Sequence, residues 1–227
     1  MNFVQQAAEM NEEGATFCAH GDMQNGFLCF RNALRILAGG AEAFEEAAIV
    51  PVASNTGFLN KMPTLVLPYS RGAASSHESQ PYFVFKDAIL FNSSRPLGSL
   101  SASHLALFFS VCEFNMALSF HLQSFQVGEK SHLITKASTL YDFCLQHVKH
   151  AAGCSEAASV LVAALSNKAQ LMNQEFGRYD ELEELKKPLL NAVSYCYANP
   201  GLFTAQEVEE FLLNIVILKE LKFAAAA

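Results

Sequence analysis

The sequence lacks tryptophan and has few charged residues, and the shortage of charge limits the kinds of partner that the chain can bind. Only 16% of its 227 residues are charged, and 15 Lys and Arg against 22 Asp and Glu give a formal net charge of -7 at pH 7. Binding to phosphates requires clustered basic residues, so we expect neither nucleic acid nor anionic membrane as a partner. Hydrophobic residues make up 51% and include 19 phenylalanines, which predicts a folded protein with a continuous core.

Targeting signals and catalytic motifs are also missing. The N-terminus has no basic start or apolar core of a signal peptide, and the six cysteines show no paired spacing, so we expect a cytoplasmic protein without disulfides. The longest apolar stretch, Leu105 to Phe114, falls short of a membrane span. Phosphate loops, dinucleotide fingerprints and nucleophile–histidine patterns do not occur, so we expect no enzyme and no cofactor.

Small and aromatic residues alternate at helical spacing between Gly14 and Ala33. Gly14 lets a second helix approach the first, and Gly21-Asp22 is typical of the end of one helix and the start of the next. Gly26, Phe30 and Ala33 then share one face of the second helix. This order of residues resembles the tetratricopeptide repeat. The resemblance implies two antiparallel helices and a surface that binds another protein.

Two later stretches repeat the pattern in part. One begins at Asn115 and resumes at Ala137 and Tyr141, and the other runs from Asn167 to Asp180. A single helical pair cannot bury its apolar face alone, so repeats of this kind must stack. The sequence therefore predicts an all-α, single-domain stack of antiparallel helical hairpins, a TPR-like α-solenoid, over residues 1–227.

Residues 49–100 form an insertion in this pattern, rich in proline, glycine and serine. Its apolar pieces, Thr64–Leu67 and Tyr82–Phe91, are typical of extended strands. The polar stretch Ser70–Gln80 predicts a mobile loop, which limited proteolysis should cut first. We therefore predict that the insertion is partly extended or forms short β structure.

Helical periodicity sets the remaining boundaries. We expect Gly39-Gly40 to end the second helix, and the helix after Ser101, apolar on nearly all sides, to be buried in the middle of the stack. The expected helices are Asn2–His20, Met23–Leu37, one after Ser101, Lys130–Ala152, one capped by Ser155 that reaches Phe176, one after the Gly177 turn, and a final amphipathic helix after the capping box Thr204–Glu207.

One cluster combines metal-ligand residue types at regular spacing: Cys144, His147, His150 and Cys154. It defines the alternative function, a metal-binding or thiol enzyme. However, one straight helix cannot surround a tetrahedral ion with four ligands, and Gly153 interrupts the helix before Cys154. We therefore predict that no metal is bound.

Four polar residues are the predicted partner contacts. The repeat resemblance implies that the first helix of each pair lines a concave groove, and Asn11, Asn115, Asn167 and Lys168 fall there. An asparagine side chain donates and accepts at once, so it can grip a peptide backbone. We predict a non-catalytic scaffold or adaptor that binds a protein partner's peptide or helix through these residues, exposed enough for their alanine variants to fold. Two other interpretations stay open: the asparagines face water, or the insertion fills the groove.

Overall fold

The all-α fold class is confirmed by a computed structural model of the chain. The structure describes residues 3–48, 85–90, 101–126, 131–152, 154, 156–174, 179–199, 208–213 and 215–216. Its helices are α1 (Phe3–Ala19), α2 (Met23–Ala48), α3 (Ala102–Gln126), α4 (Ser131–His150), α5 (Ala157–Gln174) and α6 (Tyr179–Ala198), and residues 208–213 are helical as well.

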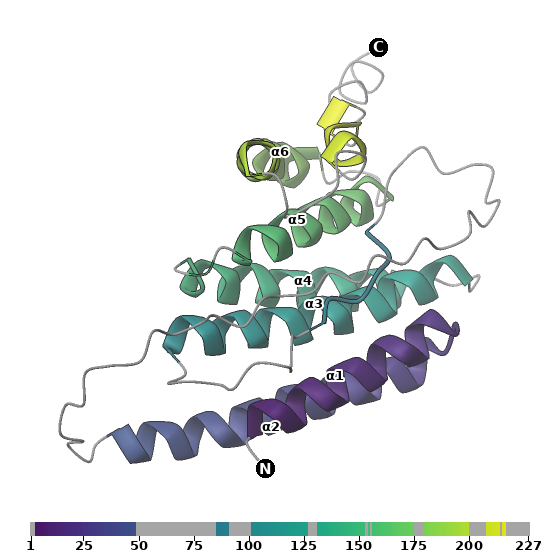
Figure 1. Cartoon of the computed structure of the whole chain (residues 1–227). Coiled ribbons are helices and arrows are strands. Elements are labelled where there is room, and N and C mark those ends of the chain that lie inside the picture. The colour runs from purple at the N-terminus through teal and green to yellow at the C-terminus, as the bar shows by residue number, and fades with distance from the viewer. Residues whose placement is uncertain are drawn as a thin grey trace.

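Successive helices pack against one another in chain order, and α3 also contacts both α1 and α5 (Figure 1). Figure 1 shows the result as layers, with α1 and α2 at one end and α6 at the other. α3 therefore connects α1 with α5. Buried residues of these three helices come together inside the molecule.

The turn between α1 and α2 forms where the sequence predicts it. Gly21 adopts a positive φ of 84°, a conformation that glycine reaches without steric cost, and this ends α1. The Asp22 carboxylate then accepts a hydrogen bond from the Asn25 backbone N–H at 3.1 Å, which caps α2. α1 and α2 approach each other closely at Gly14 and Gly26: a Cβ on Gly14 would lie 3.0 Å from the carbonyl oxygen of Gly26.

The central helix α3 is buried on nearly all sides, as the sequence predicts. The apolar part of α3 extends beyond Leu105–Phe114, and by length and composition alone this helix could cross a membrane. However, 78% of its most apolar window is packed inside the protein, as in the core helix of a soluble fold. The stretch Leu105–Phe114 contains one charged residue, Glu113, and Glu113 is itself buried.

One predicted helix break does not occur. α2 continues through Gly39-Gly40 to Ala48, so the predicted end at Leu37 is wrong. A glycine inside a helix costs only about 1 kcal/mol, and Gly40 packs against the ring of Phe3, a contact that favours continuation. Pro188 likewise lies inside α6, which runs through it to Ala198.

Of the insertion 49–100, the structure describes residues 85–90. Residues 85–90 form no strand; Leu90 makes an isolated bridge, so the prediction of a strand is wrong for these residues. We call residues 85–90 the held segment. The predicted strand Thr64–Leu67, the predicted loop Ser70–Gln80, Ser155 and the capping box Thr204–Glu207 lie outside the described residues.

Candidate functional site

Three of the four predicted contact residues, Asn11, Asn115 and Asn167, meet the held segment. They come from α1, α3 and α5, and each has 0% of its surface exposed. The expectation that these asparagines are exposed, or face water, is therefore wrong. We call the three residues the asparagine ladder.

The helices position the ladder through their buried faces. On α1, Val4, Ala7, Asn11 and Gly14 recur at intervals of three and four residues, so Asn11 points toward the core with its apolar neighbours. Asn115 lies within the fully buried middle of α3. Asn167 stands in a run of buried residues on α5. A buried amide requires hydrogen-bond partners, and backbone groups of the held segment supply them.

Each end of the held segment is paired with an asparagine through both of its backbone groups. Asn167 Oδ1 accepts the Phe85 N–H at 2.8 Å, and its Nδ2 donates to the Phe85 carbonyl at 2.9 Å. Asn115 repeats this pairing with Ile89, at 2.8 Å and 2.9 Å. Residues 85 and 89 are therefore held by atoms that every residue except proline possesses.

Asn11 adds a further contact at the Ile89 end of the segment. Its Nδ2 donates to the Ile89 carbonyl at 2.8 Å, and its Oδ1 accepts from Asn115 Nδ2, also at 2.8 Å. One carbonyl oxygen thus accepts two hydrogen bonds from two helices. The side-chain bond between Asn11 and Asn115 fixes both amides in the orientation that pairs with the segment.

A buried polar chain fixes the orientation of Asn167 as well. Burial lowers the pKa of His121 to about 4, so its imidazole is neutral at pH 7. The Gln170 Oε1 atom can only accept, so His121 Nε2 donates to it at 2.6 Å, and His121 Nδ1 accepts from the Tyr141 hydroxyl at 3.2 Å. The Tyr141 oxygen is then the acceptor for Asn167 Nδ2 at 3.1 Å.

The side chains of the held segment divide into buried and outward-facing positions. Phe85 is 3% exposed, and its ring lies 6.0 Å from Phe114 and 6.4 Å from Phe211. Ile89 is fully buried in the same core cluster. Ala88 packs in a separate cluster around Phe30 and Met116.

Between these positions Lys86 is exposed and Asp87 is half-buried. The buried side chains of the held segment are therefore those at positions 85, 88 and 89.

Lys168, the fourth predicted contact residue, does not join the ladder. It is largely buried, and its Nζ forms an ion pair with Asp142 of α4. Although Lys168 follows Asn167 directly, adjacent residues on a helix point about 100° apart. Lys168 therefore ties α5 to α4, whereas Asn167 contacts the held segment.

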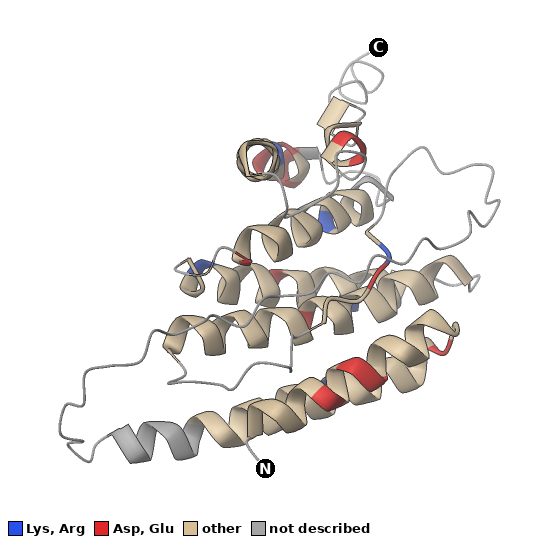
Figure 2. Ribbon diagram, viewed as in Figure 1, with Lys and Arg blue, Asp and Glu red and all other residues tan. Residues whose placement is uncertain are grey.

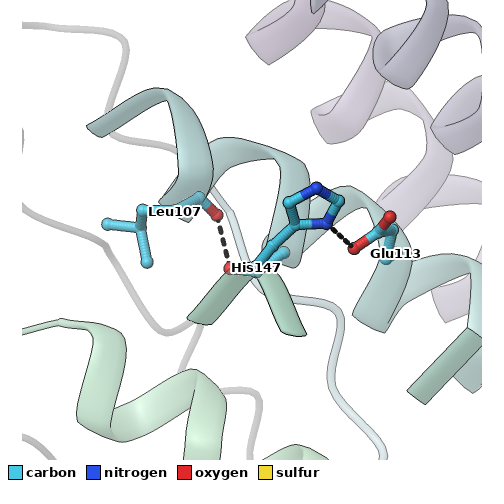
Figure 3. Close-up of polar contacts among 4 residues, drawn as sticks. Leu107, Glu113 and His147 are labelled. Atoms are coloured by element: carbon cyan, nitrogen blue, oxygen red, sulfur yellow. Dashed lines mark hydrogen bonds and ion pairs between the residues drawn. The ribbon is translucent and has the colours of Figure 1, made fainter. Parts of the chain in front are cut away.

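The residues of the alternative metal site do not come together. In the described part of the chain no three His, Cys, Asp or Glu side chains are placed to hold a metal ion. Cys144 is buried in the core, where desolvation raises its pKa well above the ordinary value, and the thiolate needed for metal binding or nucleophilic attack is disfavoured. His147 has a different partner: its Nδ1 donates a hydrogen bond at 2.7 Å to the Glu113 carboxylate of α3 (Figure 3).

Sequence reasoning placed the three asparagines near a peptide but missed the residues around them. Tyr141 was expected only to pack, and His121 and Gln170 were assigned no role. A usable signal existed: each lies in a helix whose neighbouring residues are apolar, where a polar side chain must find a buried partner.

The geometry defines a site for peptide backbone, made by side-chain amides of three helices and lined by aromatic rings. It offers no metal ligand set and no activated nucleophile among the residues described above. No family model, curated protein or solved structure matches this chain.

Proposed function

We propose that this protein is a non-catalytic interaction scaffold or adaptor of the tetratricopeptide-like kind, which binds a protein partner through peptide backbone on the α1–α3–α5 face. The observation that carries the proposal is the asparagine ladder, because it pairs both backbone groups of residues 85 and 89 of an irregular segment. Amides presented by successive first helices are a means of recognising peptide without regard to most of its side chains.

The distribution of charge favours a neutral or basic partner, and the free cysteines favour a cytoplasmic location. Exposed acidic residues gather on α1, at Glu9, Glu12 and Glu13, and few basic residues appear across the helices (Figure 2). A partner that is neutral or basic is therefore favoured over nucleic acid or anionic membrane. All six cysteines are free, and burial raises the pKa of Cys112 and Cys144, which is consistent with a reducing, cytoplasmic location.

The test is to capture partners with the full chain, purify each captured protein and reconstitute it with the chain as a defined pair. We expect a stoichiometric complex, detected by calorimetry, in which backbone amides of α1, α3 and α5 become protected from hydrogen exchange. A footprint confined to α2, α4 and α6 would move the interaction to the other side of the molecule. Failure of every captured protein to form a purified pair would contradict the scaffold function itself.

A further inference from the structure

The held segment is more than a filler of the core, because its contacts separate recognition of backbone from recognition of side chains. Only the N–H and C=O groups of Phe85 and Ile89 pair with the asparagine ladder. Side chains at three positions are buried, an aromatic ring at 85, a small residue at 88 and an aliphatic residue at 89, while Lys86 points to solvent. A peptide of another chain with the same spacing satisfies the same contacts.

We propose that the held segment is a built-in competitor for an external peptide of the pattern aromatic–x–x–small–aliphatic, which binds the asparagine ladder in the same register. This inference rests on the proposed function and names the chemistry of its partner. The pattern follows the chain's own Phe85, Ala88 and Ile89 and does not specify positions 86 and 87. Proline is excluded at 85 and 89, because it has no N–H to donate.

The aromatic position is the most selective of the three. Phe85 packs between Phe114 of α3 and Phe211, which lies in the helical residues 208–213. Aromatic pairs at this separation add to the area that they bury. The small position is Ala88, which is 7% exposed and packs in one buried cluster with Phe30 and Met116. A larger residue at 88 overpacks this cluster.

Competition favours the chain's own segment in the parental protein. A tethered segment has an effective concentration of about millimolar, so an untethered peptide of equal intrinsic affinity must reach that concentration to replace it. A change that weakens only the tethered segment should therefore uncover the site. Ala88→Leu is such a change, since it enlarges the segment and leaves every residue of the ladder unaltered.

The experiment uses the full chain, parental and Ala88→Leu, and a labelled peptide with the sequence of residues 82–92. Peptide binding is measured by fluorescence anisotropy, and thermal unfolding is followed with and without peptide. We expect the Ala88→Leu chain to bind the peptide at least about tenfold more tightly than the parental chain. Its unfolding midpoint should also rise with peptide concentration, because a ligand of the folded state stabilises it.

Two control peptides separate the ladder from nonspecific apolar adsorption. The first carries N-methyl groups on the amides of positions 85 and 89, which removes both donated hydrogen bonds and keeps every side chain. We expect it to bind the Ala88→Leu chain at least about tenfold more weakly. The second replaces Phe85 and Ile89 with alanine and should lose binding in the same way. If the Ala88→Leu chain is insoluble, Ile89→Ala takes its place in the same comparison.

The proposal is overturned if the peptide binds parental and variant chains equally, or if N-methylation leaves its affinity unchanged. Failure here is distinguishable from failure of the proposed function. A reconstituted partner complex together with a non-binding peptide would keep the scaffold function and place the partner on another surface. Loss of both would remove the function and this inference together.

Discussion

At the scale of single residues, the central feature is that three asparagines are fully buried and still satisfied. Asn167 pairs with Phe85 and Tyr141, and Asn115 pairs with Ile89 and Asn11. An amide at an apolar position costs free energy unless its donors and acceptors are paired. The ladder and the held segment therefore stabilise each other, because each supplies partners that the other would lack in the core.

Replacement of Asn167 with alanine should destabilise the folded state. It removes the hydrogen bonds that Asn167 makes with the N–H and the carbonyl of Phe85, and the loss of a buried hydrogen-bond partner costs about 1 to 3 kcal/mol. We expect a free energy of unfolding lower by about 2 kcal/mol or more, measured by chemical denaturation. The matched control is Asn191→Ala on the exposed surface of α6, which should change stability by no more than about 0.5 kcal/mol. Equal effects of the two substitutions would place Asn167 outside the core.

The pKa values of His121 and His147 shift in opposite directions. Burial lowers the pKa of His121 to about 4, so between pH 6.5 and pH 4 the unfolded chain binds a proton that the folded chain does not. This lowers stability on acidification, by up to about 3 kcal/mol. The hydrogen bond with Glu113 raises the pKa of His147, whose stabilisation is present below pH 6.5 and is lost as pH rises through the raised value.

Histidine NMR resonances check both directions. We expect the His121 ring to remain neutral at pH 5.5 while the His147 ring still carries a proton above pH 6.5. Protonation of His121 near pH 6.5 in the folded protein would mean that its ring is hydrated, and it would break the hydrogen-bond chain to Asn167.

At the scale of elements, the pairing of α1 with α2 depends on Gly14 and Gly26, where the two helices approach most closely. A Cβ on Gly26 would collide with Cys18 and lie 3.0 Å from the Gly14 carbonyl oxygen, whereas a Cβ on Gly39 of the same helix would meet nothing within 4 Å. Gly26 and Gly39 both lie in α2, but only Gly26 faces another helix closely. They therefore separate the packing of the helix pair from the helix propensity of the residue.

Opposite effects on stability are expected for Gly26→Ala and Gly39→Ala. The first overpacks the α1–α2 contact and should lower the thermal midpoint, and Gly26→Leu or Ala33→Leu should do so further, at about 1 to 3 kcal/mol each. The second should raise it, because alanine is favoured over glycine inside a helix by about 0.5 to 1 kcal/mol. Thermal melts that rank the alanine variants the other way would contradict the observed register of the pair.

Sequence patterns predicted the elements whose signals are local. The turn at Gly21-Asp22, the buried α3 and the helical pairs follow from caps and periodicity, which neighbouring residues determine. The break at Gly39-Gly40 was predicted wrongly because the contact of Gly40 with Phe3 joins residues that are far apart in the chain. The strand predicted at Tyr82–Phe91 does not form over residues 85–90 for the same reason: the backbone groups of Phe85 and Ile89 pair with asparagines from three helices that are distant in the chain.

At the scale of the whole molecule, the held segment links three helices with the helical residues 208–213. Its backbone contacts α1, α3 and α5, and its Phe85 ring reaches Phe211 near the C-terminal end. The candidate site was only half predictable. The sequence placed Asn11, Asn115 and Asn167 together, indicated peptide backbone as their ligand and left open that the insertion 49–100 fills the groove. It could not single out residues 85–90, because the pairing depends on three-dimensional proximity.

Hydrogen exchange at the amides of Phe85 and Ile89, measured by NMR on the parental full chain, tests the central claim most directly. Both amides donate to ladder asparagines inside the core, so we predict that they exchange as slowly as the amides of α3, although residues 85–90 form no helix or strand. Exchange of these two amides at the rate of an unstructured peptide, while α3 remains protected, would contradict the claim that the asparagine ladder holds this segment.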